Sequence, residues 1–224
     1  MTNVDAALRL VTDGMTVGLG SGAASERFLR GLGARVQEGL KVAGVPTSNK
    51  IAAMATGLGI PLVELGNTLP LDFTFDGADE VDPHLNMIKG YGRALVREKI
   101  VAAASKKLVI LIGPERIDEK RVAQLGSRGK LPIEVLSFAV KFVQHRLMAL
   151  GMPSEILSEN GSPVLSDNGN PILHATVKPI ANPVEFDASI HAIPGVVGTG
   201  LFLGMADLVL VQDADVVHEL RRAL

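Results

Sequence analysis

Residues 16–32, TVGLGSGAASERFLRGL, decide the fold. The first five residues are an apolar run typical of a buried strand, and residues 23–32 have the pattern of a helix. Glycines at 18, 20 and 22 stand where the strand turns into the helix. This strand–glycine loop–helix unit is typical of an α/β protein, and the rest of the chain extends it in both directions.

Short apolar runs alternate with helical patterns over the first 115 residues. This alternation predicts a mostly parallel sheet with helices on both faces. We expect strands at 42–45, 61–64, 73–75 and 108–112, and helices at 51–58 and 93–105.

The pattern changes near Gly126, where residues 126–132 are expected to form a loop. The order that follows is β-α-β-β-α-β, which is ferredoxin-like. Residues 206–211 predict one more strand, which returns to the first sheet. The expected fold class is therefore α/β, with a Rossmann-like, mostly parallel sheet domain and a smaller ferredoxin-like α+β domain. The predicted domains are 1–128 with 204–224, and 129–203.

The composition of the chain excludes several classes of function. The 22 Lys and Arg against 24 Asp and Glu give a net charge of −2, which disfavours nucleic acid as a partner. The absence of cysteine excludes thiol catalysis, disulfides and Cys-ligated zinc, and fits a cytoplasmic location. No signal peptide is visible, and the apolar runs are too short to cross a bilayer, so we expect no membrane association.

The glycine loop is a candidate phosphate site. It comprises Gly20, Ser21, Gly22, Ala23 and Ala24. Glycines allow backbone N–H groups to approach an anion, and a helix N-terminus adds positive potential. The plain alternative is a tight turn that needs glycine only for its dihedral angles.

A dinucleotide site is rejected, because no carboxylate stands at the end of the second strand, residues 44–48. Thr47 and Ser48 stand there instead, and their hydroxyls are candidates for binding a sugar.

The second candidate site is the acidic stretch DGADEVD, residues 76–82. Asp76 is expected at the carboxyl end of a strand, where parallel sheets bind ligands, and Asp79 lies one turn later. Paired carboxylates in different environments can divide acid and base roles. A solvated acidic loop and a magnesium site are the alternatives left open.

Lys89 precedes a glycine-flanked bend, and the next helix carries Glu98. The helical neighbours of Glu98 are small or apolar, namely Ala94, Leu95, Val101 and Ala102. We expect such a carboxylate to be partly desolvated, which raises its pKa toward the range of a general base. The alternative is a solvent-facing Glu98 beside Arg97 and Lys99.

Together these blocks resemble ribose-5-phosphate isomerase of the A type. The resemblance spans essentially the whole chain and rests on GLGSG, VPTS, DGADEVD, LNMIKG, REKIVA, GKLPIEVL, DNGNPIL and IPGVVGTGLF, in the family's order. It implies interconversion of ribose 5-phosphate and ribulose 5-phosphate in the pentose phosphate pathway. It also implies a sugar phosphate as the substrate, no metal, no cofactor, and a homodimer or homotetramer.

The resemblance also assigns roles to residues. Glu98 matches the base that moves a proton between C2 and C1 of the sugar. Asp76 and Asp79 match the acidic pair, and Lys89 the cation that stabilises the enediolate. The loop at 20–24 matches the phosphate-facing turn. Lys130 matches a lysine near the substrate.

This chain departs from the family pattern in two places. Ala23 and Ala24 replace two hydroxyl residues, and Tyr91 and Arg93 replace small residues after Lys89. We expect Arg93 to offset the lost phosphate contacts; the alternative is a solvated surface arginine at a helix start. The changes leave two alternatives open: a paralogue that isomerises another phosphorylated aldose, and a sugar-phosphate-binding sensor without catalysis.

Overall fold

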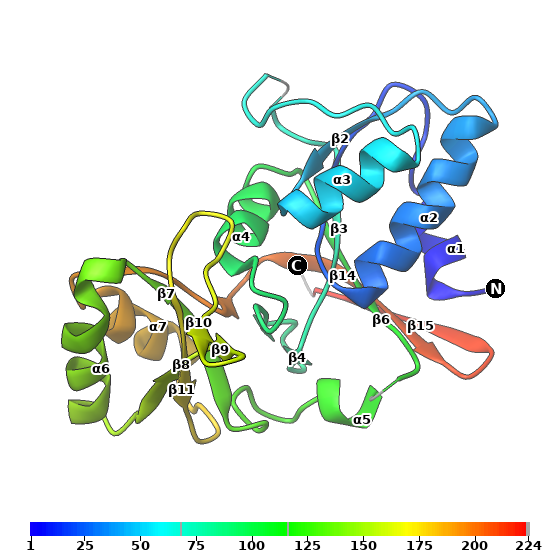
Figure 1. The fold of residues 1–224 in the computed structure, drawn as a ribbon. Coiled ribbons are helices and arrows are strands. Elements are labelled where there is room, and N and C mark those ends of the chain that lie inside the picture. Colours follow the sequence, from blue (N-terminus) through cyan, green and yellow to red (C-terminus); the bar gives the residue numbers. More distant parts are fainter. Residues whose placement is uncertain (68, 116, 223–224) are drawn as a thin grey trace. The chain divides into compact units, whose positions relative to one another are not determined.

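The computed structural model describes residues 1–67, 69–115 and 117–222 (Figure 1). The chain forms two compact units, each with its own core. The first comprises Met1–Ala78, Arg97–Lys120 and Gly204–Leu224, and the second comprises Asp79–Val96 and Arg121–Leu203.

A six-stranded sheet forms the centre of the first unit. Its order is β15-β14-β6-β3-β1-β2, and every neighbouring pair is parallel except β14 and β15. Leu108–Ile112 is buried along its whole length, as expected of a strand covered on both faces. The strands are β1 (Thr16–Leu19), β2 (Ala43–Pro46), β3 (Phe73–Gly77), β6 (Leu108–Ile112), β14 (Ala206–Asp213) and β15 (Val216–Arg221).

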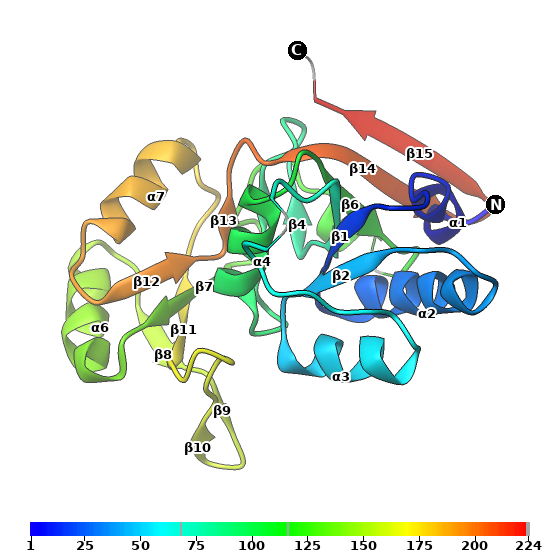
Figure 2. The same ribbon diagram turned by 90° about the horizontal axis from the view of Figure 1, so that it is seen from above.

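Helices cover both faces of this sheet, as the alternating pattern predicts. On one face α1 (Asn3–Leu8), α2 (Ala23–Gln37) and α3 (Asn49–Gly57) bury a shared core, in which the rings of Phe28 and Phe75 stack at 4.2 Å. Figure 2 shows α2 and α3 running beside β2. A separate cluster, Val45, Leu71 and Val101, brings α4 (Leu95–Ala103) onto the sheet. A short helix, α5 (Ile117–Lys120), follows β6.

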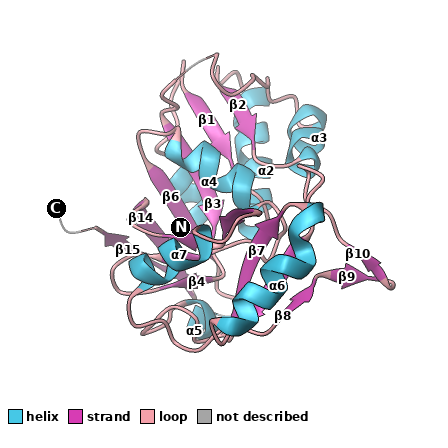
Figure 3. Ribbon diagram, turned by 90° about the vertical axis from the view of Figure 1, so that its left-hand side faces the viewer, coloured by secondary structure: helices cyan, strands magenta, loops and turns pink. Residues whose placement is uncertain are grey.

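The second unit contains the expected ferredoxin-like arrangement. Its antiparallel sheet has the order β12-β7-β11-β8, and α6 and α7 contribute Val143, Leu147 and Ile190 to one core (Figure 3). The elements are β7 (Lys130–Val135), a 3-10 turn (Ser137–Ala139), α6 (Val140–Ala149), β8 (Ser154–Ile156), β11 (Ile172–Thr176), α7 (Pro183–His191) and β12 (Val196–Thr199).

Two smaller sheets complete this unit. β4 (Glu80–Val81), β5 (Met87–Ile88) and β13 (Leu201–Phe202) form an antiparallel sheet. β9 (Ser158–Glu159) and β10 (Ser162–Pro163) form a short hairpin.

The structure corrects several expectations. Residues 61–64 are not a strand, and only Leu62 forms a bridge, to Gly44, because Pro61 has no N–H to donate. The last strand of the ferredoxin-like order, predicted at 195–203, is divided into two strands. At the division, the Gly200 N–H donates to Pro132 and the Gly200 carbonyl accepts from Lys89. Lys130 begins β7 rather than lying in a loop. The strand at 206–211 does return to the first sheet, beside β6.

Residues 79–96 and 121–128 lie with the second unit, whereas the sequence placed them in the first domain. The reason is pairing: β4 and β5 join β13, and the backbone of Val122 donates to Val81.

Candidate active site

The glycine loop joins β1 to α2 in the first unit. Gly22 is the N-cap of α2 with a φ of 97°, a conformation that favours glycine. Gly20 donates its N–H to the carbonyl of Phe75 at 2.9 Å. A Cβ on Gly20 would lie 2.3 Å from the carboxyl carbon of Asp76. Glycine is therefore required here, because the loop packs directly on the Asp76 carboxylate.

Hydroxyl groups gather beside this loop. Ser21 Oγ lies 2.9 Å from both Thr47 Oγ1 and Ser48 Oγ. Thr47 is fully buried and donates to the carbonyl of Leu19, so it has a structural role. Ser48 is the N-cap of α3 and accepts from Ile51 N. The structure thus brings Ser48 to the predicted loop, where hydroxyls and the N-terminus of α2 form a cradle suited to an anion.

Asp76 is the penultimate residue of β3 and is 1% exposed. Its Oδ1 accepts hydrogen bonds from Ser25 Oγ at 3.1 Å and from Gly77 N at 2.7 Å. Ser25 belongs to the first turn of α2, so the helix that begins in the glycine loop also orients this carboxylate. A solvated loop carboxylate is excluded for Asp76.

Glu98 lies near the start of α4 and is 3% exposed. One turn later, Val101 packs with Val45 and Leu71, and its carbonyl accepts from Ser105 Oγ at 2.8 Å. Ser105 in turn bonds Thr74 of β3 at 2.6 Å. These contacts hold α4 against the sheet. The interpretation of Glu98 as a solvent-facing residue is wrong.

The second unit holds Asp79 and Lys89. Asp79 Oδ2 accepts from the backbone N–H of Tyr91 at 3.0 Å, and its own N–H donates to Ile88 at 2.9 Å. Lys89 is 3% exposed, and its Nζ lies 5.4 Å from the ring centre of Phe202. A buried ammonium is rare in a folded protein, so Lys89 is a candidate functional cation.

Glu80, next to Asp79, binds the backbone of the segment that leads to Lys130. It is fully buried, and burial raises its pKa, although it accepts from Arg128 N at 3.0 Å and from Gly126 N at 2.6 Å. Arg128 Nη1 also donates to the carbonyl of Asp79 at 3.2 Å. The segment that leads to Lys130 is therefore fixed by the acidic stretch.

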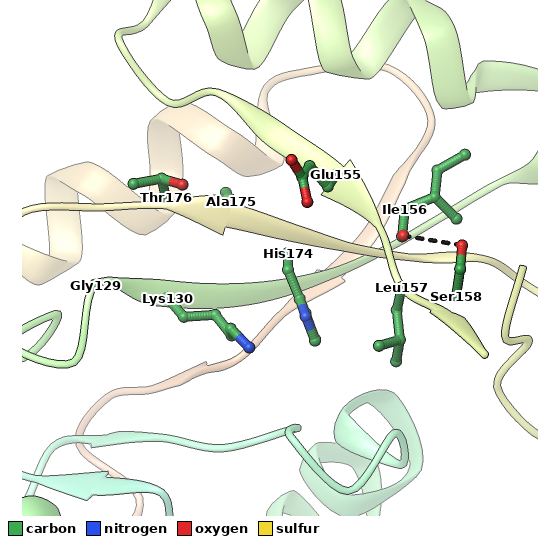
Figure 4. Close-up of a pocket in the computed structure, with 9 residues that line it drawn as sticks. All are labelled: Gly129, Lys130, Glu155, Ile156, Leu157, Ser158, His174, Ala175 and Thr176. Carbon is green, nitrogen blue, oxygen red and sulfur yellow. Dashed lines mark hydrogen bonds between the residues drawn. The ribbon is translucent and has the colours of Figure 1, made fainter. Parts of the chain in front are cut away.

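Lys130 lines a cavity of about 460 Å³ within the second unit (Figure 4). Its side chain and that of His174 point to the same side of the sheet formed by β7 and β11. Burial, together with the charges of Lys130 and Arg93, lowers the pKa of His174 to about 4. Glu155 also lines the cavity, so its wall carries charges of both signs, and His174 is neutral at physiological pH.

Arg93, which was expected to offset the lost phosphate contacts, forms an ion pair within its own unit. Its guanidinium pairs with the carboxylate of Glu159 in the β9–β10 hairpin of its own unit. Its φ is 74°, a backbone conformation that is uncommon outside glycine. The ion pair offsets the charge that was expected to bind phosphate.

The acidic stretch has no arrangement typical of a metal site. Asp82 Oδ1 accepts from the N–H groups of His84 and Asn86 at 2.8 and 2.9 Å and so closes a turn. Across residues 1–67, 69–115 and 117–222, no group of three or more His, Cys, Asp or Glu is placed to hold a metal ion. None of the helices described is long and apolar enough to cross a membrane.

Sequence reasoning missed the roles of Glu80, Arg128 and His174. The glycine loop, Asp76, Asp79, Lys89 and Glu98 carried local signals, such as strand ends and helix starts. The other three are defined by contacts with distant segments. Glu80 and Gly126, for example, are 46 residues apart.

Comparisons with known proteins agree with this geometry. Residues 43–216 match the sequence profile of ribose 5-phosphate isomerase A (phosphoriboisomerase A). The ribose-5-phosphate isomerase A of Roseiflexus castenholzii is 46% identical over 217 residues, which cover 96% of this chain and 91% of that protein.

Solved structures give the same result. Ribose 5-phosphate isomerase A from Methanocaldococcus jannaschii superposes with a TM-score of 0.91 at 37% identity, covering 98% of this chain and 96% of that one. A D-ribose-5-phosphate isomerase solved in complex with phospho-erythronic acid has a TM-score of 0.92 at 34% identity, with the same coverage.

Proposed function

The chain belongs to the ribose 5-phosphate isomerase A family and is an isomerase of ribose 5-phosphate, and we propose that it works by metal-free proton transfer through an enediolate. Ribulose 5-phosphate is then the product. The observation that carries the proposal is the burial of Glu98, which is 3% exposed on a helix fixed against the sheet. A carboxylate held in this way suits a base that must be poised above a carbon chain.

Glu98 takes the proton from C2 and returns it to C1. The charge that develops on the sugar oxygens then needs donors or cations, which act most strongly where water is excluded. Lys89 is proposed as the cation for the enediolate, and its 3% exposure supports that role. Asp76 and Asp79 are proposed to assist ring opening and to move protons at O1 and O2.

The substrate phosphate is proposed to bind at the glycine loop. Within residues 20–24, the backbone N–H groups that follow Gly20 lead into α2 and are proposed as donors, and Ser21 and Ser48 offer hydroxyls. Ala23 and Ala24 have no side-chain donor, so the main chain supplies most of these contacts. Lys130 is also proposed as a substrate-binding cation. Binding energy at the phosphate lets the open sugar be held in line for proton transfer.

We propose that the enzyme works in the cytoplasm, in the pentose phosphate pathway, as a homodimer or homotetramer. The absence of cysteine supports a reducing compartment. Three apolar side chains on and next to α6 support association with a second copy. They are exposed to 51%, 104% and 49%, for Leu136, Phe138 and Phe142 respectively.

Steady-state kinetics of Glu98→Gln test the proposal. The purified protein is given ribose 5-phosphate, and ribulose 5-phosphate is followed. We expect kcat to fall about 10²–10⁴-fold, as for other general bases, with KM changed little. Glu38→Gln, at the exposed end of α2, is the control and keeps wild-type kinetics.

Three outcomes would contradict the proposal. Wild-type kcat in Glu98→Gln removes Glu98 from the mechanism. Faster turnover of another phosphorylated aldose identifies a paralogue. Binding of ribose 5-phosphate without any turnover by the wild type identifies a sensor.

A further inference from the structure

Tyr91 is in contact with two cations of its own unit. The guanidinium carbon of Arg128 lies 5.1 Å from the centre of its ring, and Lys130 Nζ lies 5.3 Å from the same centre. Both distances fall within the range of cation–π attraction, which holds a positive charge over the negative face of a ring. The ring is thus an electrostatic support for two flexible basic side chains.

The polar atoms of Tyr91 fix the ring in place. Its hydroxyl donates to the carbonyl of Lys130 at 3.2 Å, and its backbone N–H donates to Asp79 Oδ2 at 3.0 Å. Burial raises the pKa of Tyr91 to about 12, so the hydroxyl remains a donor at any physiological pH. The residue therefore joins the backbone of Lys130 to a proposed catalytic carboxylate.

We propose that the face of the Tyr91 ring positions the Lys130 ammonium for the anionic sugar phosphate. This inference rests on the proposed function, since it assigns Lys130 to that substrate. Lys130 is otherwise an exposed side chain on a flexible four-carbon stem. Holding its ammonium over the ring before the substrate arrives lowers the ordering cost of binding. Tyr91 is a positioning residue, because it acts through Lys130.

The contacts predict an effect on KM rather than on kcat. A substitution of the Tyr91 side chain removes the ring face but keeps the backbone N–H that binds Asp79. Lys130 attracts the phosphate group of the substrate, whose charge does not change during the reaction, so its contribution is uniform binding. Tyr91→Leu should raise KM about two- to fivefold, with kcat close to that of the wild type.

The test is a double-mutant cycle with Lys130→Met. We expect Tyr91→Leu to raise KM in the wild-type background and to have little further effect once Lys130 is Met, because contacting residues are not additive. Tyr91→Phe keeps the ring face and should restore most of the affinity. Phe186→Leu, a partly buried aromatic on α7 of the same unit, is the control for general loosening of the core.

Dissociation constants for ribose 5-phosphate, measured by calorimetry on the same proteins, do not depend on turnover. If the wild type binds but does not convert the sugar, the proposed function fails while the cycle in binding still tests Tyr91. Three results would overturn the inference: wild-type affinity in Tyr91→Leu, an equal loss in the Lys130→Met background, or a Tyr91→Phe variant as impaired as Tyr91→Leu.

Discussion

His174 shows how surroundings set the charge of a single side chain. Burial, then the positive charges of Lys130 and Arg93, lowers its pKa to about 4, against about 6.5 in an unfolded chain. Protonation therefore favours the unfolded state. The contribution of His174 to the free energy of unfolding is therefore greatest above pH 6.5, and it is lost progressively as the pH falls toward 4.

Replacing His174 by a group that does not titrate should remove this loss. Between pH 7 and pH 4.5, we expect the free energy of unfolding of His174→Phe to fall by about 2–3 kcal/mol less than that of the wild type. This value follows from the size of the pKa shift. Urea unfolding at several pH values measures the difference. His145→Phe, an exposed position on α6, should follow the wild type. Parallel pH profiles for His174→Phe and the wild type would contradict the account.

At the scale of elements, the turn from β1 to α2 forms one structure with the end of β3. Gly20 bonds Phe75, and the Asp76 carboxylate fills the space where a side chain on Gly20 would lie. Ser25 of α2 binds the same carboxylate. The glycine loop and the carboxylate of Asp76, which is proposed to be catalytic, therefore cannot move independently.

Gly20→Ala tests this coupling. Its Cβ would lie 2.3 Å from the Asp76 carboxyl group, so either the loop or the acid must shift. We expect a roughly 10- to 100-fold loss of kcat/KM, because small misplacements of reacting groups are costly. Overpacking should also lower the stability by about 1–3 kcal/mol.

Gly57→Ala is the matched control, since a Cβ at this position of α3 meets no atom within 4 Å. It should keep wild-type activity. If Gly20→Ala is fully active and as stable as the wild type, the close packing of loop and acid is not required for function.

The elements also show what a sequence can predict. Strands and helices with strong periodicity were predicted nearly in place, and β6 was predicted at its observed bounds, Leu108–Ile112. The weaker predictions depended on tertiary partners. Leu62 forms only a bridge, and β4 and β5 exist because β13 returns to pair with β5. Glu80 has no local signal, because its partners are the N–H groups of Gly126 and Arg128.

At the level of the whole chain, the backbone passes from the first unit to the second and back between residues 76 and 98. Asp76 and Glu98 belong to the first unit. Asp79 and Lys89 belong to residues 79–96, which are part of the second unit. The family resemblance assigned roles to all four, and they lie in one contiguous block of the sequence. The departures, Tyr91 and Arg93, lie in the same block and contact their own unit through Lys130 and Glu159.

Proton transfer through an enediolate predicts exchange with solvent hydrogen and no requirement for a metal. Isomerisation of ribose 5-phosphate in D₂O with excess EDTA tests it most directly, with the sugar carbons followed by NMR. We predict that conversion continues and that solvent deuterium accumulates at C1 of ribulose 5-phosphate and C2 of ribose 5-phosphate over repeated reversible turnovers. Conversion that stops with EDTA and returns with Mg²⁺, or isomerisation at equilibrium with no deuterium on either carbon, would contradict the account.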